Sequence, residues 1–444
     1  MNLDFLSPEQ KKLVEFAIQG KSFFFTGAAG TGKSFVLKTI VKALRDKHGE
    51  GNVFVCASTG IAACNIGGCT VHSFAGIGLG GESKEKMLQK VLSNSNAVKR
   101  WRSAVTLIID EVSMIEPDFF DLLEHIGQKV RNSKRTKALS DLPFGGIQVI
   151  LCGDFFQLPP VKSVKYLFQA KCWKKVINFS TELRTVFRQK DAEFVKLLNE
   201  VRRGILSKEG LEMLKSCQGR KFNTEDGIEP TVLYPTKHNV DQENSQQLEK
   251  LEGVTMLFKA RDTSPYQNNF TDQLKKNCSA KDDLKLKIGA QVILLKNISQ
   301  EKELVNGARG TIINFVNDEK TGLDVPLVKF INGTYLIRPE KWAITVGKVE
   351  VAAREQIPLD LAWAMSIHKS QGMTIDRLKV SIDKVFASGQ AYVALSRATS
   401  LEVSHNDTNS STHPKRACAS LATSTQLKSS PTKQSSTSTT QCKT

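Results

Sequence analysis

Short apolar runs alternate with amphipathic segments through the first half of the chain. The runs at 22–27, 53–59, 105–110 and 147–154 are apolar almost throughout, which predicts strands buried on both faces of a parallel sheet. After the first and third of these runs, apolar side chains recur at helical spacing. This alternation predicts a doubly wound α/β domain that binds its ligand at the carboxyl ends of the strands.

The second half of the chain has two different patterns of apolar and polar residues. Residues 231–236, 361–374 and 378–383 resume the alternation, which predicts a second α/β lobe. Between them, short apolar runs are separated by Gly and Asn-Gly turns, which predicts the hairpins of a small β-barrel inserted in that lobe. The expected domains are a first lobe over 1–183, a second lobe over 184–400 and a barrel-like insertion over 297–357.

Residues 401–444 differ from both lobes. They contain ten Ser and nine Thr among scattered Lys, Pro and Asn, with almost no apolar pattern. Such a segment buries too little surface to offset the entropy lost on ordering, so we expect a disordered tail.

Charge and composition narrow the class of protein. The formal net charge is +17, and 401–444 hold only five basic and two acidic residues, so most of the excess lies on the lobes. A basic body of this kind favours a nucleic-acid partner. The nine cysteines lack zinc-ligand spacing and are expected to be reduced thiols. No apolar run approaches the about 18 residues of a membrane span, and the first residues resemble neither a signal nor a transit peptide.

The loop between the first apolar run and the first helix has phosphate-binding spacing. It reads G-x-x-x-x-G-K-S, from Gly27 to Ser34. Backbone N–H groups of such a loop cradle phosphates at a helix N-terminus, while the Lys reaches the β- and γ-phosphates and the Ser ligates Mg²⁺. We therefore expect ATP and Mg²⁺ as cofactors, held by Gly27, Ala28, Ala29, Gly30, Thr31, Gly32, Lys33 and Ser34.

Five further residues complete a candidate hydrolytic site. Asp110 ends a strand, where it can hold Mg²⁺, and Glu111 can polarise the attacking water. Gln157 follows another strand and can sense the γ-phosphate. Arg188, where the lobes join, and Arg397, in the second lobe, can act as arginine fingers. Taken singly, such acids can merely cap a helix, and such arginines commonly form surface salt bridges.

The order of the motifs resembles the PIF (petite integration frequency) DNA helicases of superfamily 1B, especially the animal members. The likeness covers about residues 6–400. The motifs are LSPEQ, GAAGTGKS, ASTGIAA, TVHSFAGIG, IDEVSM, PFGGIQVILCGDFFQLPP, VFRQ, LAWAMSIHKSQGMT and GQAYVALSRA. The stretch at 119–131 looks like the family signature, which disfavours a RecD-type helicase. The paired lobes disfavour a nucleotide kinase.

The resemblance implies two RecA-like lobes with ATP between them, forming an ATP-hydrolysing DNA helicase. It implies 5′-to-3′ unwinding of duplexes, junctions, G-quadruplexes and RNA–DNA hybrids in genome and telomere maintenance, by a monomer in the nucleus and also the mitochondrion. It places a small wedge element near 64–95 and assigns Gln10 to adenine. The residues it implies along single-stranded DNA are Thr59, Gly60, His72, Phe74, His238, Asn239, His368, Lys369 and Ser370.

Two departures from the family pattern leave a rival open. Met1 stands nine residues before Gln10, where family members carry a further region. After SRATSLE the family continues with an apolar segment that completes the second lobe, whereas this chain turns polar. We interpret this as an alternative or truncated C-terminus. The rival is a DNA-binding regulatory form without unwinding activity.

Overall fold

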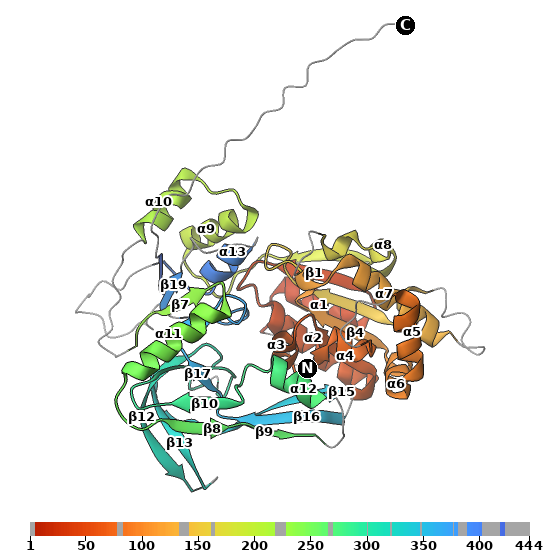
Figure 1. Ribbon diagram of the computed structural model, residues 1–444. Coiled ribbons are helices and arrows are strands. Elements are labelled where there is room, and N and C mark those ends of the chain that lie inside the picture. Colours follow the sequence, from red (N-terminus) through yellow and green to blue (C-terminus); the bar gives the residue numbers. More distant parts are fainter. Residues whose placement is uncertain are drawn as a thin grey trace.

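A parallel sheet forms the centre of the first lobe (Figure 1). The computed structural model describes residues 5–77, 83–132, 142–160, 165–217, 228–264, 270–299, 301–319, 322–346, 349–375, 377–380, 389–401 and 418–421. The sheet has the order β3-β2-β4-β5-β1-β6, and neighbouring strands pair in parallel. Its strands are β1 Phe23–Gly27, β2 Val53–Ala57, β3 Cys69–Thr70, β4 Thr106–Asp110, β5 Gln148–Cys152 and β6 Phe179–Leu183. The four predicted strands are thus confirmed.

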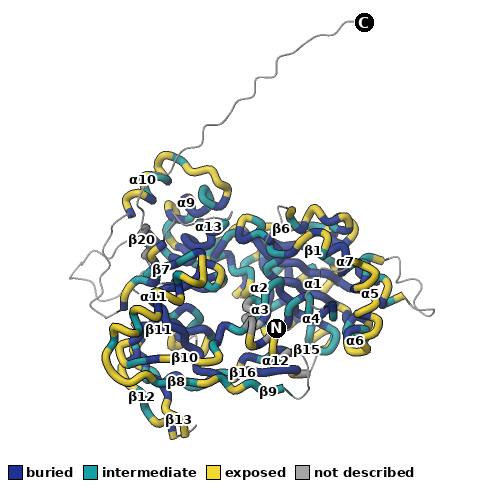
Figure 2. The backbone as a smooth tube through the Cα atoms, viewed as in Figure 1, coloured by how far each residue is buried: buried dark blue, intermediate teal, exposed yellow. Residues whose placement is uncertain are grey.

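Helices cover both faces of this sheet because its strands are apolar on both sides. Phe23 and Phe25 face a core shared with α1 and α2, whereas Phe24 faces a core shared with α4–α7. Figure 2 shows the buried strands inside a more exposed shell of helices. The helices are α1 Pro8–Ile18, α2 Lys33–His48, α3 Gly60–Asn65, α4 Val71–Ala75, α5 Lys84–Ser93, α6 Ser95–Ser103, α7 Pro117–Arg131 and α8 Trp173–Val176. Residues 78–82 of the predicted wedge lie outside the described residues.

The second lobe repeats the design on a smaller scale. Its parallel sheet has the order β18-β7-β19-β20. The strands are β7 Thr231–Tyr234, β18 Ala364–Ser366, β19 Arg377–Val380 and β20 Cys418–Leu421, and the helices are α9 Ala192–Arg203, α10 Lys208–Ser216, α11 Lys237–Lys250 and α13 Gln390–Leu395. The predicted second α/β lobe is confirmed.

One part of the predicted disordered tail is wrong. Residues 418–421 form β20, which pairs with β19. The prediction failed because four residues are too short a run to stand out from a polar segment, whereas an open sheet edge can still pair with them. The rest of the predicted tail after Leu401 lies outside the described residues.

The inserted β region is larger than predicted, and a barrel is not confirmed. It begins at Met256 and contains three antiparallel sheets, with the orders β14-β13-β12-β11-β17, β15-β16-β9 and β10-β8. No pairing among the described residues closes them into a barrel. The elements are β8 Met256–Lys259, β9 Arg261–Thr263, α12 Phe270–Asn277, β10 Asp283–Leu286, β11 Gln291–Leu294, β12 Arg309–Asp318, β13 Leu323–Phe330, β14 Gly333–Leu336, β15 Glu340–Val346, β16 Val349–Gln356 and β17 Leu359–Leu361.

The β15–β16 hairpin and α12 reach the first lobe. Both α12 and β15 contact α3, and the three elements lie beneath that helix in Figure 1. Ile344 and Ala352 of the hairpin belong to the same apolar cluster as Phe74. The insertion therefore bridges the lobes on the side away from α9 and α13. Among the described residues, no helix has the length and apolar character needed to cross a bilayer.

Candidate nucleotide site between the two lobes

The phosphate-binding loop lies between β1 and α2. Gly30 and Gly32 have φ of +86° and +78°, a region that favours glycine. A Cβ on Gly30 would lie 2.6 Å from Gln189 Oε1, and one on Gly32 would lie 2.8 Å from Gln10 Nε2. No side chain caps the N-terminus of α2. A glycine-rich loop at an uncapped helix N-terminus fits an anion, and phosphate binding there stays a prediction.

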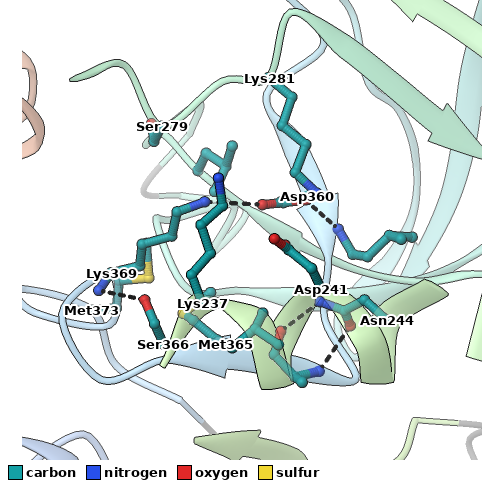
Figure 3. Close-up of a pocket in the computed structure, with 14 residues that line it drawn as sticks. Lys237, Asp241, Asn244, Ser279, Lys281, Asp360, Met365, Ser366, Lys369 and Met373 are labelled. Carbon is teal, nitrogen blue, oxygen red and sulfur yellow. Dashed lines mark hydrogen bonds and ion pairs between the residues drawn. The ribbon is translucent and has the colours of Figure 1, made fainter. Parts of the chain in front are cut away.

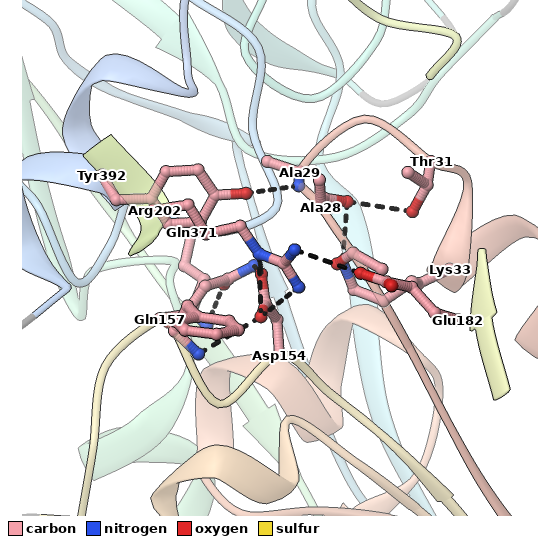
Figure 4. A network of polar contacts seen from close by, with 12 residues as sticks. Ala28, Ala29, Thr31, Lys33, Asp154, Gln157, Glu182, Arg202, Gln371 and Tyr392 are labelled. Carbon is pink, nitrogen blue, oxygen red and sulfur yellow. Dashed lines mark hydrogen bonds and ion pairs between the residues drawn. The ribbon is translucent and has the colours of Figure 1, made fainter. Parts of the chain in front are cut away.

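Lys33 is held over this loop. Its Nζ donates to the carbonyl oxygens of Gly27, at 2.7 Å, and Ala28, at 3.1 Å. Thr31 Oγ1 also donates to the Ala28 carbonyl, at 2.9 Å (Figure 4). The Lys33 ammonium group therefore lies inside the curve of the phosphate-binding loop, which is the position that phosphate contact requires.

Gln10 lies against the same loop. Its side chain is buried; Oε1 accepts the Ser7 N–H, and Nε2 donates to the Thr31 carbonyl. Sequence reasoning missed Phe187, which is 52% exposed and whose ring passes 3.7 Å from a Cβ built on Gly32. An aromatic residue just before Arg188 was the signal that could have found it. An exposed ring at this place can stack on a base.

The two acids lie at the end of β4, where Asp110 is buried and Glu111, the next residue, is half-buried. Glu111 has φ of +52° and donates its N–H to Asp110 Oδ1 at 2.9 Å. Burial and the charge of Asp110 raise the pKa of Glu111 to about 7, and burial raises the pKa of Asp110. Glu111 Oε2 is buried without a hydrogen-bond partner among the described residues, and its side chain does not cap the next turn. Capping is thus not its role.

Arg397 of the second lobe lies close to Glu111, and Arg188 lies close to Arg397. Burial and the charge of Arg188 lower the pKa of Arg397 to about 9, and Glu111 opposes this shift. Burial lowers the pKa of Arg188 to about 10. Within the described residues neither forms an ion pair; they donate to carbonyls instead, Arg188 to Ser396 and Arg397 to Val393. Among the residues that the structure describes, the surface salt bridges considered for these arginines are therefore not formed, and no contacting carboxylate neutralises their charge.

The lobes also touch through polar contacts that the sequence did not reveal. Tyr392 Oη of α13 accepts the N–H of Ala29 in the loop at 2.7 Å. Gln371 Nε2 of the second lobe donates to Gln157 Oε1 at 3.1 Å. Burial raises the pKa of Tyr392 to about 12, so its hydroxyl stays neutral. Figure 4 shows these side chains converging from both lobes on the loop.

The candidate DNA-contacting residues of the first lobe lie around α3 and α4. Thr59 Oγ1 accepts the Ala62 N–H, and Gly60 begins α3. The His72 ring stacks on Phe119 with centroids 4.4 Å apart, and burial lowers its pKa, which favours the neutral imidazole. These three residues keep a partly exposed surface. Their contact with DNA stays a prediction.

Two of the predicted DNA contacts are wrong. Phe74 is fully buried, and its ring packs between Phe54 and Trp101 with centroids 5.1 and 4.8 Å away. It cannot stack on a base. Ser370 is also fully buried; its hydroxyl donates to the Ile367 carbonyl, and its own carbonyl accepts from Arg397. A motif gives the order of residues, not which side of a short helix or turn faces the core.

The second-lobe candidates lie by a small basic pocket. His238 and Asn239 lie on the first turn of α11, and His368 is exposed in the loop after β18. Figure 3 shows Lys369 and Lys281 around Asp360, and Nζ of the two lysines lies 3.6 and 2.6 Å from its carboxylate. Other lining residues are Lys237, Asp241, Asn244, Ser279, Met365, Ser366 and Met373. The pocket places extra cations next to the predicted DNA path.

Comparison with known proteins gives consistent matches. The family description "PIF1-like helicase" matches residues 5–211, and "DNA helicase Pif1, 2B domain" matches 269–315. The ATP-dependent DNA helicase PIF1 of Rattus norvegicus is 44% identical over 404 residues, covering 89% of this chain and 60% of the relative. The chain thus spans about 60% of the length of such curated relatives.

Solved structures agree over a greater share of their length. The crystal structure of Pif1 helicase from Candida albicans is 39% identical, with a TM-score of 0.68 and 94% of each chain covered. A Bacteroides Pif1 helicase in complex with ADP-AlF3 and ssDNA is 31% identical, with a TM-score of 0.58, covering 88% of this chain and 90% of that one. The sequence and the fold of this chain together show that it belongs to the PIF1-like helicase family.

Proposed function

We propose that this protein is an ATP-dependent DNA helicase. It would move 5′ to 3′ along single-stranded DNA and unwind duplexes, junctions, G-quadruplexes and RNA–DNA hybrids. The observation that carries the proposal is the buried Arg397 of the second lobe close to Glu111 of the first, with the half-buried Arg188 close to Arg397. A site divided in this way makes hydrolysis depend on lobe closure, which is what a motor needs.

The chain's own groups have distinct parts in hydrolysis. The loop amides and Lys33 would bind the phosphates, and Gln10 with Phe187 would hold the adenine. Glu111, whose pKa of about 7 suits a base at neutral pH, would orient the attacking water and take its proton. Arg188 and Arg397 would meet the charge that develops on the γ-phosphate.

The residues near the loop also fit a magnesium ion. Ser34 lies in the first turn of α2 and Asp110 ends β4, and a cation would oppose the burial that raises the pKa of Asp110 and Glu111. Ser34 and Asp110 would hold the ion, which would supply charge neutralisation at the phosphates. Carboxylate and hydroxyl oxygens are the donors that Mg²⁺ prefers.

DNA would lie across both lobes. The formal charge of +17 and the basic pocket around Lys369 support a channel that follows the phosphate backbone. Thr59, His72 and His368 offer neutral donors and acceptors to phosphate oxygens whatever the base. The similar Pif1 helicase from Bacteroides has been solved in complex with single-stranded DNA, which supports the same partner here. We propose that the protein described here acts as a monomer in the nucleus and the mitochondrion.

The regulatory rival is less well supported. It requires a second lobe that no longer presents Arg397, yet α13 is buried and Arg397 donates to Val393, Ser370 and Ser396. The observed packing therefore favours the enzyme.

Unwinding of duplexes that carry a 5′ or a 3′ single-stranded tail tests the proposal. The expected result is ATP-driven strand separation from the 5′ tail alone, abolished by Lys33→Ala. Lys38→Ala is a matched control, because Lys38 is an exposed lysine of the same helix that lies one turn beyond the loop. DNA binding without ATP turnover or unwinding would instead support the regulatory rival.

A further inference from the structure

A buried ion cluster joins the lobes next to Gln157. Arg202 of α9 donates Nη2 to Asp154 Oδ1 at 2.9 Å and Nη1 to Glu182 Oε1 at 3.1 Å. Its Nε lies 3.3 and 3.2 Å from the two oxygens of Asp154, which completes a fork. The side chains of Arg202 and Asp154 are 4% and 0% exposed. The arginine belongs to the second lobe and both acids to the first (Figure 4).

Asp154 shapes the loop that carries Gln157. Its Oδ1 accepts the Phe156 N–H at 3.2 Å, and its carbonyl accepts the Gln157 N–H at 2.9 Å. Oδ2 also accepts from Gln157 Nε2, at 3.5 Å. The Arg202 guanidinium carbon lies 4.6 Å from the centre of the Phe156 ring, over its face. Arg202 thus contacts both the Asp154 carboxylate and the Phe156 ring of this loop.

The same arginine is tied to the finger-bearing part of the second lobe. Helix α9 packs against α13, whose end presents Arg397. The N-cap of α13 comes so close to the loop that a Cβ on Gly389 would lie 2.4 Å from the Gln157 carbonyl oxygen. Displacement of α9 or α13 must therefore displace Gln157 as well.

We propose that Arg202 is a positioning residue that fastens the Gln157 loop to the second lobe, so that Gln157 reads the γ-phosphate only when the lobes are closed. The inference rests on the proposed ATP site and adds a residue to it. Arg202 touches neither the phosphate loop nor the arginine fingers in the contacts seen here, so it acts through Asp154. A buried ion pair is a poor means of adding stability, because desolvation offsets its attraction. A positional role is therefore the better explanation of this contact.

The test compares binding of ADP with binding of ADP–aluminium fluoride and magnesium, a mimic of the transferring phosphoryl group. Dissociation constants of wild type, Arg202→Gln, Arg202→Lys and Arg203→Gln are measured by calorimetry. Arg203→Gln is the matched control, since Arg203 neighbours Arg202 on α9 but is exposed. Melting temperatures accompany each variant, and ADP affinity reports whether the loop itself remains intact.

We expect Arg202→Gln to lose the preference for the mimic by about tenfold to 100-fold, the scale of a misplaced catalytic group, with ADP affinity unchanged. Arg202→Lys keeps the charge but loses the forked pair of hydrogen bonds, so it should keep part of the preference for the mimic. Arg203→Gln should keep all of it. Asp154→Asn should lose as much as Arg202→Gln. The double variant should lose no more than either, because each breaks the same contact.

The outcomes separate the two claims. A wild-type protein that binds both nucleotides equally would contradict the proposed ATP site and this inference with it. If the wild type prefers the mimic to ADP and the Arg202→Gln variant prefers it equally strongly, the inference about Arg202 is overturned while the proposed ATP site stands. Additive losses in the double variant would also overturn it. A fall in ADP affinity that parallels the fall in melting temperature would reduce Arg202 to a structural role.

Discussion

Glu111 combines a strained backbone with an unsatisfied carboxylate. A non-glycine residue at φ of +52° costs free energy, and so does a buried oxygen without a partner. Both costs fall on one residue that faces Lys33 and Arg397, and such features gather at functional sites. The sequence could place Glu111 after a strand but could not show its strain or its burial.

Glu111→Gln should lower ATP turnover by about 10²–10⁴-fold, the usual contribution of a general base, with nucleotide affinity kept. In the wild type, turnover should rise as pH increases through about 7, because the base must lose its proton and burial raises its pKa to about 7. Steady-state kinetics from pH 6 to pH 8.5 measure both effects. A variant with wild-type turnover would exclude Glu111 as the base.

Phe74 shows how a family motif can mislead about a single residue. Its motif neighbour His72 keeps an accessible edge, whereas Phe74 packs between Phe54 and Trp101. Position along a short helix decides between the two, and a motif does not encode it.

Phe74→Ala should lower the free energy of unfolding by about 3–5 kcal/mol, the cost of a large cavity in a core. DNA affinity of the folded fraction should be unchanged. Phe187→Ala is the contrasting variant: its ring is exposed, so stability should change by less than about 0.5 kcal/mol while the KM for ATP rises. Chemical denaturation measures the free energy of unfolding of each variant, and titration with DNA measures its DNA affinity. A stable Phe74→Ala with weakened DNA binding would restore the stacking role.

Among the elements, those with strong local signals were predictable. The largely apolar strands β2, β4 and β5 and the loop after β1 follow from periodicity and spacing. The β15–β16 hairpin was predictable as a hairpin, but not its contact with α3, because nothing local specifies a partner far away in sequence. The pairing of β20 with β19 escaped prediction for the same reason.

Ile344→Ala tests that docking. Ile344 lies in the first-lobe cluster at 6% exposure, so its truncation should cost about 2–5 kcal/mol of unfolding free energy and speed amide exchange in α3. Lys341→Ala on the same strand is the control, since that side chain is exposed and its ion pair with Glu350 adds little. Unchanged exchange in α3 would mean that the hairpin does not support the first lobe.

At the scale of the whole molecule, the site belongs to neither lobe alone. The first lobe supplies the phosphate loop and the acids, and the second supplies Arg397 and Tyr392. Sequence motifs supplied the candidate residues of this site, whose roles stay predictions, and the resemblance correctly implied two lobes. The contacts that hold the lobes together, Tyr392 to Ala29 and Arg202 to Asp154, could not be predicted because each joins segments that only folding brings together.

The most direct test of the divided site is ATP turnover by Arg397→Lys in saturating single-stranded DNA, beside the wild type. Lysine keeps the charge but cannot reproduce the fork of a guanidinium, so turnover should fall about 10³-fold or more, as for a lost arginine finger, while ATP affinity stays near that of the wild type. Wild-type turnover in the variant would contradict the account, because the second lobe would then contribute nothing to the chemistry.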